Sequence, residues 1–170
     1  MILTHFMVYN GVIDKKMKVD TGSPVTILNI DSLARILGYD AATIERHLKN
    51  KAAVRYTSFT KEYVSLYPCL LRNVIIGDTD LSKGNSMYIN DLVVFVTLDK
   101  NRTNLLGLDI ISSCKSNIVY RYKMTMEGFD SDLYARNIAR LCCGINPYEI
   151  NELIQVKSSI SGLLSKAEGS

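Results

Sequence analysis

Asp20-Thr21-Gly22 is a short polar segment between two apolar ones, and its surroundings restrict how the N-terminal part can fold. Residues 3–9 and 12–19 alternate as strands do and meet at Asn10-Gly11, a pair typical of tight hairpin turns. The second strand is therefore expected to end at Asp20 and to present its carboxylate there. Gly22 would give the loop backbone conformations that are closed to other residues. An ordinary Asp-initiated turn between strands explains the same residues, and both interpretations stay open.

A second motif lies further along the chain, where Leu105-Leu106-Gly107 places a glycine after two apolar residues. Together and in this order, the two motifs resemble those of the retropepsins, the retroviral-type aspartic peptidases. The resemblance spans residues 1–126. It implies a mainly β fold, a retropepsin-like acid protease closed barrel with an inserted helix. Residues 127–170 would then be a C-terminal helical extension.

The resemblance implies a role for each residue of the two motifs. Asp20 would be the catalytic residue, and its loop would be supported by Thr21, Gly22, Leu106 and Gly107. In the family, the hydroxyl at the position of Thr21 hydrogen-bonds across a dimer axis, and the glycine at the position of Gly107 lets two backbone segments approach closely. A buried strand with a glycine kink also explains Leu106-Gly107 and is compatible with this role.

The resemblance also implies an extended peptide substrate, held in a groove and covered by a flap. The flap would lie between paired strands over residues 53–56 and 62–67, although its tip lacks the glycine that many flaps have. An ordinary surface hairpin is the alternative for this segment. Pro24 has no N–H, so one substrate hydrogen bond of the family would be missing or replaced. The predicted substrate-binding residues are Gly22, Ser23, Val25, Ile27, Ser58, Phe59 and Thr60, with Leu106 as a further apolar subsite.

The chemistry of this family needs two carboxylates, and the sequence has one suitable motif. A homodimer would bring Asp20 and its symmetry mate together on the two-fold axis. Two such carboxylates cannot easily both ionise, so they would share one proton. One would take the proton of a water molecule while the protonated other polarised the scissile carbonyl. The sequence therefore predicts an aspartic endopeptidase that acts on a peptide or protein substrate and needs no metal and no other cofactor.

Two alternatives belong to other classes of protein. A catalytically silent retropepsin-like dimer could serve as a peptide-binding or scaffolding module, although intact Asp20, Thr21 and Gly22 argue against it. A monomeric all-β domain could carry the motif by accident, and a stable monomer in solution would favour that interpretation.

Composition and charge limit the classes of partner that we expect for this chain. The 170 residues are 47% hydrophobic and long enough to bury a core, and the net charge of +3 comes without a basic patch interleaved with aromatics. We therefore expect no nucleic-acid partner. The N-terminal stretch fits neither a signal peptide nor a membrane span, so no membrane partner is expected. The four cysteines lack zinc-ligand spacing and are expected to be buried thiols in the cytoplasm. His47 has no second ligand at metal-binding spacing.

The spacing of apolar residues and the capping residues predict helices and strands around these motifs. Asp31-Ser32 is expected to cap a helix that ends at Gly38, and a second helix is expected over residues 41–50. From Asp130 the apolar spacing becomes helical again, with a stop at Gly144 and a further helix after Pro147. These C-terminal helices would pack on the barrel or on the partner subunit. Further strands are expected over residues 70–76, 87–98 and 117–126.

Overall fold

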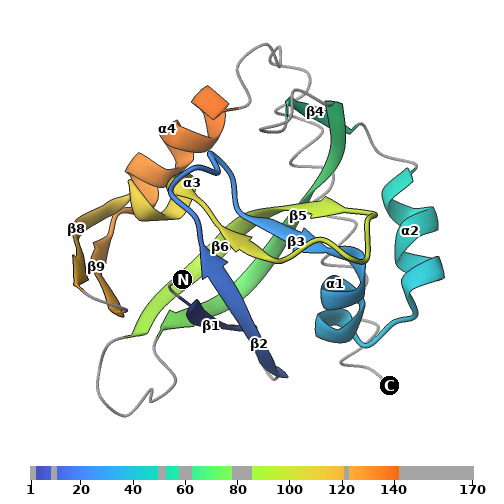
Figure 1. Cartoon of the computed structure of the whole chain (residues 1–170), viewed down its shortest axis with the longest axis horizontal. Helices are drawn as coiled ribbons and strands as arrows, with labels where there is room; N and C mark the ends of the chain where they lie inside the picture. The colour runs from blue at the N-terminus through green and yellow to red at the C-terminus, as the bar shows by residue number, and fades with distance from the viewer. Residues whose placement is uncertain are drawn as a thin grey trace.

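A computed structural model shows a mainly β chain with a few short helices (Figure 1). It describes residues 3–8, 11–49, 53–57, 63–77, 86–120 and 123–141. The strands are β1 (Leu3–Val8), β2 (Gly11–Val19), β3 (Ile27–Asn29), β4 (Val54–Thr57), β5 (Tyr63–Gly77), β6 (Ser86–Thr97), β7 (Leu105–Leu106), β8 (Cys114–Tyr120) and β9 (Lys123–Phe129). The helices are α1 (Ile30–Leu37), α2 (Ala41–Lys49), α3 (Leu108–Ile111) and α4 (Ser131–Leu141).

In the described part of the chain, one sheet has the strand order β1-β2-β7-β3-β6-β5-β4, and β1 also pairs with β5. The predicted hairpin of β1 and β2 is confirmed by their antiparallel pairing. The short strand β7 lies between β2, to which it is parallel, and β3, to which it is antiparallel. This position brings the end of β2 and the second motif side by side, although they are far apart in the sequence. β8 and β9 form a separate antiparallel pair.

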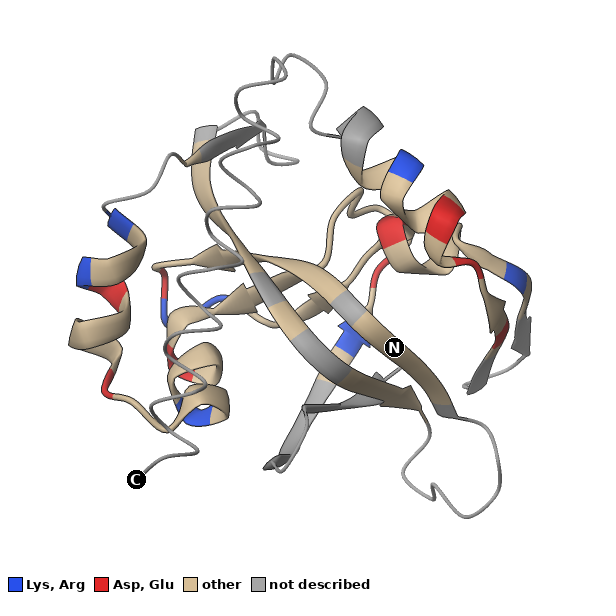
Figure 2. Ribbon diagram, turned by 180° about the vertical axis from the view of Figure 1, so that it is seen from behind, with Lys and Arg blue, Asp and Glu red and all other residues tan. Residues whose placement is uncertain are grey.

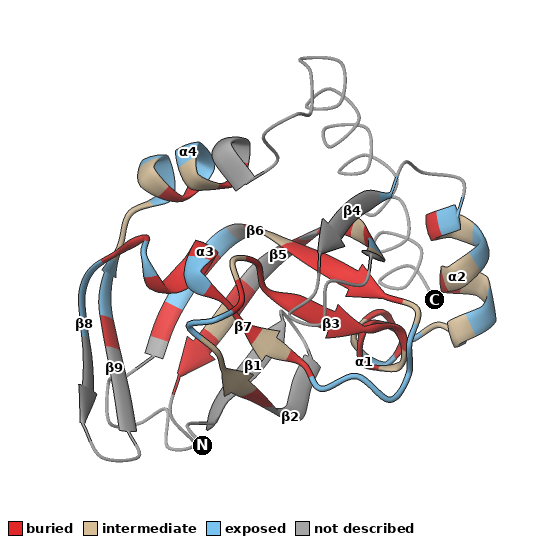
Figure 3. Ribbon diagram, turned by 45° about the horizontal axis from the view of Figure 1, so that its top comes forward, coloured by how far each residue is buried: buried red, intermediate tan, exposed pale blue. Residues whose placement is uncertain are grey.

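The core consists of apolar side chains from the strands and from the inner faces of the helices. Figure 3 shows buried residues concentrated in β3, in the adjoining part of β6 and on one side of α1. Leu33 of α1 and Ile44 of α2 are almost fully buried. Acidic and basic residues are interspersed on the peripheral helices (Figure 2). Burial of the apolar faces thus fixes α1 against the sheet and α2 against α1.

Four predicted elements differ in detail from the structure. Asn29, rather than Asp31 or Ser32, caps α1, because its extended backbone lets its side chain accept the Ser32 N–H at 2.8 Å. The end of α1 at Gly38 is confirmed, with φ of 72°. The strands expected over residues 62–67 and 70–76 are parts of one strand, β5. The single strand expected over 117–126 is instead the end of β8 and most of β9.

Helix α4 packs on the same core as the sheet. Its Tyr134 and Ile138 are buried at 5% and 7% exposure. Asp130 caps the helix, because its Oδ1 accepts the N–H groups of Asp132 and Leu133, each at 3.0 Å. The helix that the sequence predicts here is therefore confirmed, and it contacts its own chain. The further helix expected after Pro147 lies outside the described residues.

Candidate functional site

Asp20 directly follows β2, in a tight loop that its own carboxylate helps to close. The Asp20 N–H donates to the Leu106 carbonyl oxygen at 2.9 Å, and the Ser23 N–H donates to the Asp20 carbonyl oxygen at 3.1 Å. The Gly22 N–H donates to Asp20 Oδ1 at 2.9 Å. Asp20 is half-buried, whereas Thr21 and Gly22 are exposed. The loop therefore fixes one carboxylate oxygen and leaves Thr21 and Gly22 accessible.

Gly22 has a different role from the one that its backbone freedom suggests. The glycines with positive φ in the described part of the chain are Gly38 and Gly128, so Gly22 does not adopt a left-handed conformation. A Cβ at Gly22 would instead lie 3.1 Å from Asp20 Oδ1. The expectation of a special backbone conformation at Gly22 is wrong, and the glycine serves the close approach of the carboxylate to the Gly22 amide.

Gly107 lies where the second motif crosses directly behind the loop. A Cβ at Gly107 would lie 2.7 Å from the Ser23 carbonyl oxygen and nearer still to the carbonyl of Val25. Two hydrogen bonds fix this crossing: the Leu108 N–H donates to the Ser23 carbonyl oxygen at 2.8 Å, and the Asp109 N–H donates to that of Pro24 at 3.1 Å. The close backbone approach expected at Gly107 is therefore present, and no other residue type fits without movement of the main chain.

Asp109 is a second carboxylate behind the loop, and sequence reasoning misses it. It is 1% exposed. Its Oδ1 accepts the Thr26 hydroxyl at 2.7 Å, and its Oδ2 accepts the Thr26 N–H at 3.0 Å. Burial raises the pKa of the Asp109 carboxyl to about 6, and the hydrogen bonds from Thr26 act in the opposite direction. An acidic residue between Leu108 and Ile110 in an apolar segment is the signal that could have identified it.

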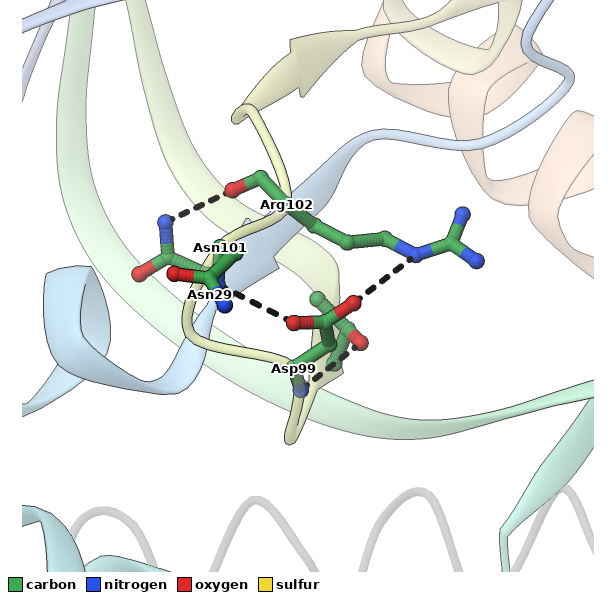
Figure 4. A network of polar contacts seen from close by, with 5 residues as sticks. Asn29, Asp99, Asn101 and Arg102 are labelled. Atoms are coloured by element: carbon green, nitrogen blue, oxygen red, sulfur yellow. Dashed lines mark hydrogen bonds and ion pairs between the residues drawn. The ribbon is translucent and has the colours of Figure 1, made fainter.

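Asn104 joins the second motif to β2 and to α1. Its carbonyl oxygen accepts the Lys18 N–H at 3.0 Å. Its side chain accepts the Asn29 N–H at 2.9 Å and donates to Ser32 Oγ at 2.8 Å. Asn29 in turn donates its side-chain amide to the Arg102 carbonyl oxygen at 2.9 Å (Figure 4). The segment that leads into β7 is thus held from both sides by buried amides.

The predicted substrate-binding residues lie in two kinds of surroundings. Val25 and Ile27 are each 6% exposed and pack in the core of the chain. Ser23 is buried, and its hydroxyl donates to the Val25 carbonyl oxygen at 2.7 Å. Leu106 is fully buried beneath the loop. The predicted flap residues Ser58, Phe59 and Thr60 lie outside the described residues. The structure thus brings together the residues of both motifs, and the substrate-binding roles stay predictions.

Titratable groups elsewhere in the described part of the chain include cysteines and a histidine. No group of three or more His, Cys, Asp or Glu side chains there could hold a metal ion. Cys69 and Cys114 are buried free thiols, and burial raises the pKa of Cys114 to about 11. His47 is half-buried, and its Nε2 has no hydrogen-bond partner among the described residues. None of the helices described reaches the length and apolarity that crossing a membrane requires.

Comparison with known proteins finds similarity among solved structures. No protein-family model matches the chain. No curated protein matches it either. The crystal structure of a retropepsin-like aspartic protease from Rickettsia conorii is 20% identical, with a TM-score of 0.44. The match covers 69% of this chain and 75% of that one.

Proposed function

We propose that the chain is a retropepsin-like aspartic endopeptidase that hydrolyses peptide bonds with a water molecule activated between Asp20 and the Asp20 of a second copy. One observation carries the proposal: the second motif crosses directly behind the Asp20 loop, with Gly107 in main-chain contact and Leu106 bonded to the Asp20 N–H. This crossing supports a loop held in one geometry, in which the Asp20 carboxylate is half-buried. Pairing of β1 with both β2 and β5 supports the closed-barrel form of the fold.

The proposed site is shared between two copies because this chemistry needs two carboxylates that face each other. Asp109 is not a second catalytic group in this proposal, since it is buried and both its oxygens accept hydrogen bonds from Thr26. A homodimer with a two-fold axis beside the exposed Thr21 would supply the second Asp20. The two aspartates would share one proton, one acting as base toward water and the other polarising the carbonyl.

The substrate in this proposal is an extended peptide or protein segment. The Gly22 carbonyl oxygen accepts no hydrogen bond from the described residues, so it can accept an N–H of the substrate backbone. The main-chain groups of Ser23 are already used within the chain: its N–H donates to Asp20, and its carbonyl oxygen accepts the Leu108 N–H. Gly22 is therefore the better of the two predicted hydrogen-bonding partners for the substrate.

Cleavage of a diverse peptide library, read by mass spectrometry, tests the proposal. Wild type and Asp20→Asn are compared from acidic to neutral pH, with Asp132→Asn as the control, since Asp132 is an exposed aspartate on α4. We expect Asp20→Asn to lower cleavage by roughly a thousandfold or more, as loss of a catalytic group does, and Asp132→Asn to cut like the wild type. Equal cleavage by Asp20→Asn and wild type would refute the aspartic mechanism. Binding of peptides without turnover would identify a binding module instead.

Mixing wild type with Asp20→Asn tests whether the site is shared. Mixed dimers would contain a single ionisable Asp20, so an excess of the variant should lower wild-type activity toward zero. Activity per wild-type chain should also rise with protein concentration, as dimer formation does. Sedimentation of the wild type over the same concentrations gives the oligomeric state. A sedimenting monomer whose activity is unaffected by the variant would show that one chain forms the whole site.

A further inference from the structure

We propose that Asp109 is a positioning residue for the Asp20 loop and acts on it through Thr26 and the main chain of Gly107. The inference rests on the proposed function where it concerns catalysis. It rests on the hydrogen bonds alone where it concerns the geometry of the loop. Asp109 does not reach the reacting atoms in this role, so its effect on the reaction would be indirect.

The hydroxyl of Thr26, which is fully buried, links Asp109 to Gly107. It donates to Asp109 Oδ1 at 2.7 Å and accepts the Gly107 N–H at 3.1 Å. A hydroxyl has one hydrogen, so donation to Asp109 directs its lone pairs toward other donors. The carboxylate therefore orients the hydroxyl as the acceptor that Gly107 needs.

Main-chain hydrogen bonds link the segment that carries Asp109 to the loop itself. The segment from Leu106 to Asp109 bonds the loop at three places: Leu106 accepts the Asp20 N–H at 2.9 Å, Leu108 donates to Ser23 at 2.8 Å, and Asp109 donates to Pro24 at 3.1 Å. The Asp109 carboxylate holds this segment and Thr26 together from the buried side. A change at Asp109 is therefore expected to move the loop that carries Asp20.

A carboxylate at this buried place costs free energy. Both oxygens of Asp109 accept from neutral donors, which are the Thr26 hydroxyl and N–H and the Ile110 N–H at 2.9 Å. No cation is bonded to Asp109 among the described residues, and burial disfavours its charge. A core position that served packing alone would be better filled by an apolar side chain. Polar groups kept against such a cost are characteristic of sites that need fixed geometry.

The test compares Thr26→Val, which removes the hydroxyl at similar volume, with Thr26→Ser, which keeps it. Thr97→Val is the matched control, because Thr97 is also buried, at 2% exposure, and its hydroxyl accepts the Asp99 N–H at 3.2 Å. Asp109→Asn is added as the variant that removes the charge. Each full-length chain is measured by amide hydrogen exchange and by kcat and KM on a cleaved library peptide.

We expect Thr26→Val and Asp109→Asn to raise the exchange rates of the Asp20 and Ser23 amides by about tenfold or more, while amides of the β5–β6 ladder change little. We expect kcat to fall by about 10- to 100-fold with a smaller change in KM, since misplacement of a catalytic group costs rate. Thr26→Ser should restore both readouts, and Thr97→Val should leave the loop amides unchanged. Uniformly faster exchange throughout the sheet, or unchanged exchange in the loop, would overturn the inference.

The two readouts separate this inference from the proposed function. If the wild type cuts no peptide, the peptidase proposal fails, and hydrogen exchange alone decides the role of Asp109. Local loss of protection at Asp20 then supports the positioning role, and its absence refutes it. If the wild type cuts and the variants retain its kcat, the positioning role in catalysis is refuted while the peptidase proposal stands.

Discussion

At the scale of single residues, Gly107 is a position with no room for a side chain. The carbonyl groups of Ser23 and Val25 occupy the space that any Cβ would need, and both belong to the main chain. We predict that Gly107→Ala lowers the free energy of unfolding by about 3 kcal/mol or more, because a backbone shift must relieve the overlap. Urea denaturation followed by circular dichroism measures this change.

Gly38→Ala is the control for Gly107→Ala. Gly38 has a left-handed φ of +72°, but a Cβ there would meet nothing within 4 Å. Its substitution should therefore cost only about 1 kcal/mol, from the backbone conformation. If both alanine variants lose the same free energy of unfolding, the close approach behind the Asp20 loop does not contribute the stability predicted for it.

At the scale of elements, α4 contributes a side chain that hydrogen-bonds main-chain groups of β6, as a neighbouring strand would. The Tyr134 hydroxyl accepts the Val93 N–H at 3.0 Å and donates to the Val93 carbonyl oxygen at 3.1 Å. Tyr134→Phe would leave both main-chain groups without this partner. We predict a loss of about 1–3 kcal/mol in the free energy of unfolding, measured by urea denaturation. The phenyl ring can keep its contact with Phe129, so the variant isolates the hydroxyl. A loss below about 0.5 kcal/mol would contradict the assignment.

Elements with strong local signals could be predicted from the sequence. Asn10-Gly11 marks the β1–β2 hairpin, and Gly38 marks the end of α1. The hairpin of β8 and β9 could not be predicted, because Arg121-Tyr122 lies between the strands and is not a typical turn sequence. The cap at Asn29 was missed because Asp31 and Ser32 are equally good capping types, and only the backbone conformation separates them.

In the candidate site too, local motifs could be predicted from the sequence and long-range contacts could not. Asp20-Thr21-Gly22 and Leu106-Gly107 are local motifs, and the sequence indicates them and their proximity through a family resemblance. The pairing of Asp109 with Thr26 joins residues 83 positions apart, and no local pattern encodes such a contact. Ser23 was predicted to bind substrate because it lies beside the motif. The sequence does not reveal that its hydroxyl and main-chain groups already form hydrogen bonds within the chain.

At the scale of the whole molecule, the buried Asp109 makes stability depend on pH. Its pKa in the folded chain is about 6, above the ordinary value of 3.8, so the folded state binds the proton more tightly. The associated stability is present below about pH 4 and is lost as pH rises through about 6. We predict that this loss reaches at most about 3 kcal/mol in the free energy of unfolding. Urea denaturation at pH 4, 5, 6 and 7 measures it.

Asp109→Asn separates this contribution from those of the other titrating groups. The variant has no ionisable group at this position, so the difference in stability between wild type and variant should shrink or reverse as pH rises from 4 to 7. A difference that is constant over this range would mean that Asp109 titrates normally in the folded chain. Each comparison uses the same buffer and ionic strength, because exposed charges respond to salt.

The distance in sequence between Thr26 and Asp109 also orders the events of synthesis. The hairpin of β1 and β2 can pair as soon as it leaves the ribosome, since its strands are neighbours in the chain. Closing the 83-residue separation must wait for the second motif and for other long-range contacts to accompany it. Asp20 is thus synthesised early, whereas the residues that hold its loop are synthesised later. A growing chain carries its aspartate in an unbraced loop until the residues behind that loop have been translated.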